Sequence, residues 1–174
     1  MSTTTPRPTR RLVPALVIYT AAVVCVAGIG GLATAAGQGA DGWYGDAEKP
    51  FFTPPGAVFG PVWTILYAGL IFTAWRLSRV RAAGGSAAPE ASAALRLWWL
   101  QLAANFLWTP LFFAAEWLWV GLIDIVILDV LVILLLRRAW RADRQAAVPL
   151  QPYLAWILFA TALTASVAWL NQPL

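Results

Sequence analysis

Apolar residues lie along the chain in five long runs, and polar residues separate the runs instead of alternating with apolar ones. A helix crosses the roughly 30 Å of bilayer hydrocarbon with about 20 apolar residues, and each run is close to that length or longer. We therefore predict an all-α integral membrane protein, a five-transmembrane-helix bundle that occupies residues 1–174 as a single domain. The helices are expected at approximately 12–36, 55–76, 96–115, 117–137 and 150–170.

The connections between these runs are short, with one exception. Residues 82–94, with the sequence AAGGSAAPEASAA, predict a flexible polar linker between the second and third helices. The chain shows no internal repeat of the kind found in inverted-repeat secondary transporters, although a five-helix bundle does not exclude transport. Composition supports the membrane assignment, because 60% of the 174 residues are hydrophobic and only 11% are charged.

Basic residues are concentrated on one side of the predicted bundle. Eleven of the twelve precede the first helix or lie between the second and third or the fourth and fifth helices: Arg7, Arg10, Arg11, Arg76, Arg79, Arg81, Arg96, Arg137, Arg138, Arg141 and Arg144. Only Lys49 lies on the opposite side, with Asp41, Asp46 and Glu48. The positive-inside rule then predicts a cytoplasmic N-terminus and an external C-terminus, and the pattern suggests a bacterial inner membrane.

The same asymmetry accounts for the net charge of +4 without a nucleic-acid partner, because arginines that flank spans set membrane topology. We expect no nucleic-acid binding. A signal peptide cleaved near Ala33, Thr34 and Ala35 is an alternative interpretation of the first run, but that run is longer than an ordinary signal core.

Residues for metal binding and nucleophilic catalysis are nearly absent. The chain has no histidine, one cysteine (Cys25) and one methionine (Met1). We therefore expect no metal site and no bound cofactor, and a Ser-His-Asp or Cys-His nucleophile is excluded because its base is missing.

Aromatic residues are unusually frequent, with eleven tryptophans, eight phenylalanines and four tyrosines. An interfacial belt is the simplest interpretation of the tryptophans near span ends, Trp75, Trp98, Trp117, Trp119, Trp140 and Trp169. In contrast, Phe59, Trp63 and Tyr67 recur every four residues, which places three rings in one stripe of the second helix.

Two other helices carry comparable stripes, consisting of Gln101, Asn105, Trp108 and Phe112 on the third and Tyr153, Trp156, Phe159 and Ala160 on the fifth. Amides and carboxylates are costly in hydrocarbon, so Gln101, Asn105 and Asp124 should point into the bundle. They either join helices by hydrogen bonds or line an internal pocket with the aromatic stripes. Their alignment with those stripes favours a pocket.

Two carboxylates lie inside the fourth helix, at Asp124 and Asp129. Five residues correspond to about 140° around a helix, so the two cannot share a face as a catalytic dyad. We expect Asp129 to snorkel or pair toward the arginine-rich end, and Asp124 to lie nearer mid-membrane.

Several motifs occur together in a fixed order. The segment 43–67 contains Trp43-Tyr44, Glu48-Lys49-Pro50, Thr53-Pro54-Pro55-Gly56, Phe59-Gly60-Pro61-Val62-Trp63 and Leu66-Tyr67. Downstream are Gln101-Leu102, Asn105, Trp108, Pro110-Leu111-Phe112-Phe113, Asp124, Pro152-Tyr153-Leu154-Ala155-Trp156 and Phe159-Ala160-Thr161. In order and spacing this pattern, over residues 12–169, resembles the translocator protein (TspO/MBR) family, also called tryptophan-rich sensory proteins. The resemblance is specific, because many Trp, Pro and Asn positions agree at once.

The resemblance implies a five-helix bundle, often a homodimer, with a pocket that opens toward the loop between the first two helices. That pocket would bind protoporphyrin IX or a related tetrapyrrole, and also benzodiazepine-type and isoquinoline-type ligands. Family members are also assigned to outer membranes. The positions that match family pocket residues are Trp43, Tyr44, Pro54, Phe59, Trp63, Asn105, Trp108, Asp124, Trp156 and Ala160, and the stripes add Phe112 and Phe159.

The sequence departs from the family pattern at two places. In the sterol-recognition stretch, Ala165 stands where the family has a tyrosine and no basic residue follows, so sterol binding by that route is not expected. Asp129 matches no residue of the pattern.

Two hypotheses involve tetrapyrroles. The first is a membrane sensor, regulator or carrier, in which Trp43 and Tyr44 close the pocket and Asn105 anchors the ligand. The second is an enzyme that degrades protoporphyrin in light, with Trp63 and Trp156 as catalytic residues.

A third hypothesis is a membrane scaffold that binds partner proteins through helix faces. Ala27 and Gly31 form a small-xxx-small pair, which permits close approach of two helices. Packing inside the bundle explains the same pair equally well.

Overall fold

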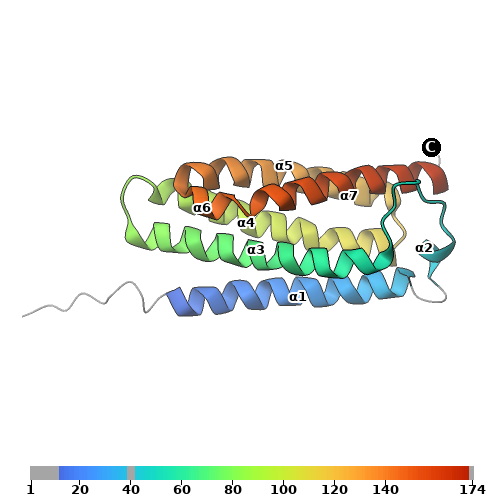
Figure 1. Ribbon diagram of the computed structural model, residues 1–174, viewed down its shortest axis with the longest axis horizontal. Helices are drawn as coiled ribbons and strands as arrows, with labels where there is room; N and C mark the ends of the chain where they lie inside the picture. The colour runs from blue at the N-terminus through green and yellow to red at the C-terminus, as the bar shows by residue number, and fades with distance from the viewer. Residues whose placement is uncertain (1–11, 39–41, 173–174) are drawn as a thin grey trace, which may run out of the picture.

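The computed structural model describes residues 12–38 and 42–172 and shows an all-helical bundle (Figure 1). Within these residues the long helices are α1 (Leu12–Gln38), α3 (Gly56–Ala83), α4 (Ala88–Thr109), α5 (Leu118–Ala142) and α7 (Leu150–Asn171). The short ones are α2 (Trp43–Asp46), α6 (Arg144–Ala147) and a π-helical segment, Pro110–Ala114. The described residues contain no strand, which confirms the predicted all-α class. Arg7, Arg10, Arg11 and Asp41, which support the topology prediction, lie outside the described residues.

Four helical stretches of the described chain are long and apolar enough to cross a membrane. They are Val13–Gln38, Gly56–Ala83, Leu118–Ala142 and Arg144–Asn171. The fifth long helix, α4, has 22 residues, but Arg96, Gln101 and Asn105 make it more polar than the others. The chain is therefore a multi-pass membrane protein by length and composition, with α4 as the least apolar long helix.

The prediction of a flexible linker over residues 82–94 is wrong. Helix α3 continues to Ala83 and α4 begins at Ala88, so only residues 84–87 connect them. Gly84 and Gly85 make the turn with φ of 75° and 77°, a left-handed conformation that glycine adopts without strain. After the turn, alanine favours helix, and Ala91 and Ala94 are completely buried. The sequence looked like a linker because small residues suit close packing as well as flexibility.

The third predicted helix, 96–115, is interrupted near its end. Helix α4 stops at Thr109, and Pro110–Ala114 continues as a π-helical segment. Pro110 has no N–H to donate, which breaks the regular α-helical hydrogen bonding at this point. The wider turn brings Phe112 and Phe113 into a buried cluster with Tyr44.

One tryptophan assigned to the interfacial belt lies instead in the core. Trp98 has no exposed surface, and its Nε1 donates a hydrogen bond of 3.0 Å to the Leu70 carbonyl oxygen. Tyr19 packs edge-on against the Trp98 ring, and its hydroxyl lies 2.7 Å from Ser78 Oγ. These contacts hold α1, α3 and α4 together in the half of the bundle that contains the α3–α4 connection.

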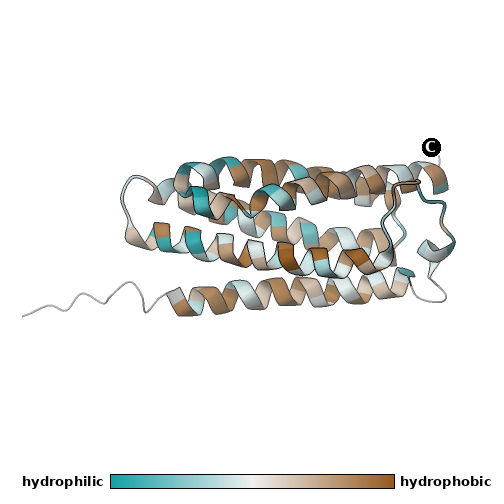
Figure 2. Ribbon diagram, in the orientation of Figure 1, coloured by the Kyte–Doolittle hydropathy of each residue, from teal (hydrophilic) through white to brown (hydrophobic). Residues whose placement is uncertain are grey.

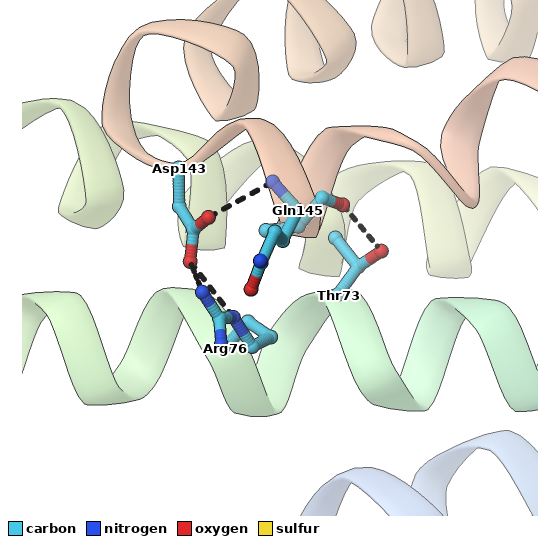
Figure 3. A network of polar contacts seen from close by, with 5 residues as sticks. Thr73, Arg76, Asp143 and Gln145 are labelled. Carbon is cyan, nitrogen blue, oxygen red and sulfur yellow. Dashed lines mark hydrogen bonds and ion pairs between the residues drawn. The ribbon is translucent and has the colours of Figure 1, made fainter.

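Hydrophobic residues cover most of the length of the helices, and hydrophilic residues gather toward the ends of the bundle (Figure 2). At the end that contains α6, Arg76 Nη2 on α3 lies 2.7 Å from Asp143 Oδ2. The other oxygen, Oδ1, accepts a bond of 2.9 Å from the Gln145 N–H and caps α6 (Figure 3). Close by, Thr73 Oγ1 donates to the Ala146 carbonyl oxygen at 2.8 Å. Two polar contacts thus attach α6 to α3.

We predict that Asp143→Ala lowers stability more than Arg76→Ala. The first variant loses the ion pair and the helix cap, about 1–2 kcal/mol in total, whereas the second loses only a partly exposed ion pair worth less than about 1 kcal/mol. Thermal unfolding in detergent, monitored by circular dichroism, measures the stability change of each variant. Arg137→Ala serves as the control, since Arg137 is exposed. Equal shifts for the two variants would show that the cap contributes nothing.

Candidate ligand cavity

A cavity of about 310 Å³ lies in the half of the bundle next to α2. Its walls come from α1, α2, α3, the end of α4, the π-helical segment and α7. Seven of the residues expected at the pocket line it: Tyr44, Phe59, Trp63, Trp108, Phe112, Trp156 and Ala160. None of the described lining residues carries a charge. The cavity therefore suits an apolar, aromatic ligand surface.

The aromatic rings of the wall support one another through ring contacts. Trp108 and Phe112 are stacked, with ring centroids 5.4 Å apart and planes at 16°. Phe59 meets Trp156 edge to face at 5.7 Å, which joins α3 to α7. Such pairs stabilise the folded state by about 0.5–1.5 kcal/mol beyond the area they bury. The walls are consequently held in place before any ligand enters.

Helix α1 contributes lining residues that the sequence pattern did not predict for the pocket. They include Ala27 and Gly31, the small-xxx-small pair. A methyl group placed on Gly31 would have no neighbouring atom within 4 Å, so no other helix among the described residues packs closely at this position. The small side chains leave space for the cavity instead. The remaining lining residues outside the predicted set are Gly30, Thr34, Gln38, Gly60, Thr64, Tyr67, Thr109, Phe113, Leu163 and Thr164.

Three other predicted pocket residues, Trp43, Pro54 and Phe159, are not part of the cavity wall. Trp43 packs against Tyr44, and its Nε1 donates a bond of 3.1 Å to the Phe113 carbonyl oxygen. Phe159 packs against Trp156 at 5.5 Å. Pro54 is half-buried in the connection between α2 and α3. Trp43 and Phe159 thus support residues of the wall.

Asn105 is buried one layer behind the wall, in a chain of hydrogen bonds. The hydroxyl of Tyr67, which lines the cavity, donates to Asn105 Oδ1 at 2.9 Å. Asn105 Nδ2 donates to the Tyr153 hydroxyl oxygen at 3.2 Å, and that hydroxyl donates to Gln101 Oε1 at 2.8 Å. Gln101 and Asn105 thus point into the bundle as expected. They orient Tyr67 and join α3, α4 and α7.

The two carboxylates of α5 lie outside the cavity wall. Asp124 is half-buried, and its Oδ2 has no hydrogen-bond partner among the described residues. Asp129 is buried and accepts a bond of 2.8 Å from Thr161 Oγ1 on α7. The expectation that Asp129 reaches the arginine-rich end is wrong, because a hydroxyl on the adjacent helix provides a nearer partner.

The segment that contains α2 closes the cavity through Tyr44 and is attached to the bundle at two points. Trp43 bonds to Phe113 at one end. At the other, Asn171 at the end of α7 bonds to both polar groups of the Glu48 backbone: Oδ1 accepts from the N–H at 2.9 Å, and Nδ2 donates to the carbonyl oxygen at 2.9 Å. Burial raises the pKa of the Tyr44 phenol, so this hydroxyl stays neutral at physiological pH.

The fold and the cavity together define a multi-pass, all-helical membrane protein with an aromatic internal pocket. Residues 19–170 match the model of the TspO/MBR family. The chain belongs to this family.

Several relatives cover most of the chain. A tryptophan-rich protein TspO from Archaeoglobus fulgidus is 38% identical over 164 residues, 90% of this chain and 96% of the relative. Protein CrtK from Rhodobacter capsulatus is 34% identical, covering 74% of this chain and 78% of that protein. The human translocator protein is 32% identical and covers 70% of each chain.

We predict that Asn171→Ala loosens the segment around α2. The change removes two hydrogen bonds to the Glu48 backbone, so amide exchange around residue 48 should accelerate by about five- to tenfold. Hydrogen exchange with mass spectrometry on ligand-free protein measures it. Gln172→Ala is a matched control, because Gln172 Nε2 bonds to the Glu116 carbonyl oxygen and not to this segment. Unchanged exchange in Asn171→Ala would show that these two bonds do not hold the segment.

Proposed function

We propose that this protein binds protoporphyrin IX or a related tetrapyrrole in the cavity and acts as a membrane sensor, regulator or carrier of it. The observation that carries the proposal is the uncharged aromatic wall formed by rings from four parts of the chain, represented by Tyr44, Trp63, Trp108 and Trp156. A planar tetrapyrrole has two large apolar faces, which such a wall holds by burial and stacking. Benzodiazepine-type and isoquinoline-type ligands have the same character and suit the same wall.

The residues of the wall favour a macrocycle held by its faces and not by a central metal. The sequence has no histidine, and Cys25 is not among the described lining residues. Tyr67 and Thr164 are among several lining residues with uncharged polar groups, which can orient a polar edge of the ligand. Binding therefore depends on shape, stacking and a few hydrogen bonds.

We further propose that α4 is the fifth membrane span and that its polar residues face the bundle. Gln101 and Asn105 are buried and hydrogen-bonded to Tyr153, which removes them from contact with lipid. Five spans would place the N-terminus in the cytoplasm and the C-terminus outside, in agreement with the orientation predicted from the arginine distribution. A homodimer in the bilayer is part of the same proposal and follows from the family resemblance.

Replacement of an aromatic residue in the wall tests the binding proposal. We expect Trp156→Ala to weaken protoporphyrin IX binding by about tenfold or more, because it removes a large contact face and leaves a void. Quenching of tryptophan fluorescence in nanodiscs, titrated in the dark, measures the dissociation constant. Trp140→Ala is the control, since Trp140 lies on α5 outside the lining set. Equal affinity for the wild type and Trp156→Ala would place the ligand elsewhere.

A second candidate function is light-dependent oxidative breakdown of protoporphyrin, with dioxygen as the oxidant. The observation that favours it is that Trp63 and Trp156 both line the cavity, so their indole rings can contact an excited macrocycle. Trp63 also lies 5.1 Å from Tyr67 between ring centroids, which provides a neighbouring oxidisable ring.

The two functions are separated by a double variant, Trp63→Phe with Trp156→Phe. Phenylalanine keeps an aromatic face but is much harder to oxidise than indole, so binding should persist. If the protein is an enzyme, a defined product formed by the wild type under light should disappear in the variant. Absorbance spectra and product analysis in aerated buffer provide the measurement. The same product in both proteins would indicate photosensitised damage without catalysis by these residues.

A further inference from the structure

The proposed ligand carries negative charges that have no charged partner among the described residues of the cavity wall. Protoporphyrin IX carries two propionate groups in addition to its apolar faces. Burial of a carboxylate without a partner is costly, and none of the described residues of the wall is charged. The carboxylate edge of such a ligand must therefore lie at the boundary of the cavity, beside a cation or in water.

One cation in the sequence lies near that boundary. Lys49 is the only lysine or arginine between Arg11 and Arg76, and it belongs to the segment between α2 and α3. Its Nζ is 4.8 Å from the centroid of the Tyr44 ring, which forms part of the wall. Figure 1 shows this segment at the opposite end of the bundle from α6 and the α3–α4 connection, where the described arginines lie.

The Lys49 ammonium group is oriented by its neighbours without being neutralised by them. Nζ donates to the Gly45 carbonyl oxygen at 2.9 Å and to the Ala47 carbonyl oxygen at 3.3 Å. An ammonium group has three N–H donors, so one remains for another acceptor. The ion pairs found in the described part of the chain involve Arg76, Arg138 and Arg141, and none involves Lys49.

We propose that Lys49 binds a carboxylate of the ligand at the rim of the cavity and selects tetrapyrroles with a free acid edge. The inference rests on the proposed tetrapyrrole binding and adds the residue that recognises the charged edge. The macrocycle faces contact the aromatic wall, and one propionate lies outside Tyr44 within reach of Nζ. Esterified or otherwise neutral analogues gain the wall contacts alone.

A pair of ligands that differ only in charge provides the test. Protoporphyrin IX and its dimethyl ester are titrated against wild type, Lys49→Met and Lys49→Arg in phosphatidylcholine nanodiscs, with tryptophan quenching as the readout. We expect Lys49→Met to bind the diacid about tenfold more weakly and the diester within about twofold of wild type. Lys49→Arg should retain the preference for the diacid. Added salt should lower the affinity of the wild type for the diacid and leave that of Lys49→Met unchanged.

The comparison between ligands separates recognition from an effect on the loop. Loss of the bonds from Nζ to Gly45 and Ala47 would weaken the binding of both ligands alike. An equal loss of affinity for diacid and diester would therefore overturn the role proposed for Lys49 but not the proposed tetrapyrrole binding. Unchanged binding of both ligands to Lys49→Met and Lys49→Gln would overturn it as well. If the wild type bound neither compound, the tetrapyrrole proposal itself would fail, and this inference with it.

Discussion

Polar groups inside an apolar bundle must find hydrogen-bond partners within the protein, and this constraint organises the molecule. Four side chains meet most of it in one chain of bonds, from Tyr67 through Asn105 and Tyr153 to Gln101, in which Gln101 Nε2 alone has no partner among the described residues. The chain crosses α3, α4 and α7, so it sets the relative positions of three helices at once. Because each bond requires a particular distance, a helix that slid along its neighbour would leave a buried amide unpaired. The cavity is built on this fixed arrangement.

The cavity itself depends on where large and small side chains are placed. Aromatic residues on α3 and α7 meet in pairs such as Phe59 and Trp156, which keeps these walls rigid. Helix α1 has small residues over the same depth, including Ala27 and Gly31. A small pair in a membrane helix is usually associated with close packing against another helix. Here the pair borders the cavity and leaves room for a ligand.

The two ends of the bundle are stabilised by different interactions. At the arginine-rich end, charged side chains pair across helices, as Arg76 does with Asp143 and Arg138 with Glu90 at 3.1 Å. At the end next to the cavity, the side-chain amide of Asn171 bonds to the backbone of the loop. The single cation there, Lys49, forms no ion pair with a residue that the structure describes. A loop attached by a few hydrogen bonds can open at moderate cost. The end that faces the cavity is thus the one suited to ligand entry and to recognition of a negative charge.

The sequence by itself determined the helical class, the concentration of arginine at one end and the aromatic stripes on three helices. These features are local, because run length and periodicity depend only on neighbours along the chain. The tertiary structure alone decided that residues 88–94 are helical, that Trp98 is buried, and that Asp129 bonds to Thr161. It also decided that Asn105 lies behind Tyr67 and that α1 forms part of the cavity wall. Each of these outcomes depends on which side chain of another helix comes within bonding distance, and periodicity along one helix carries no information about that distance.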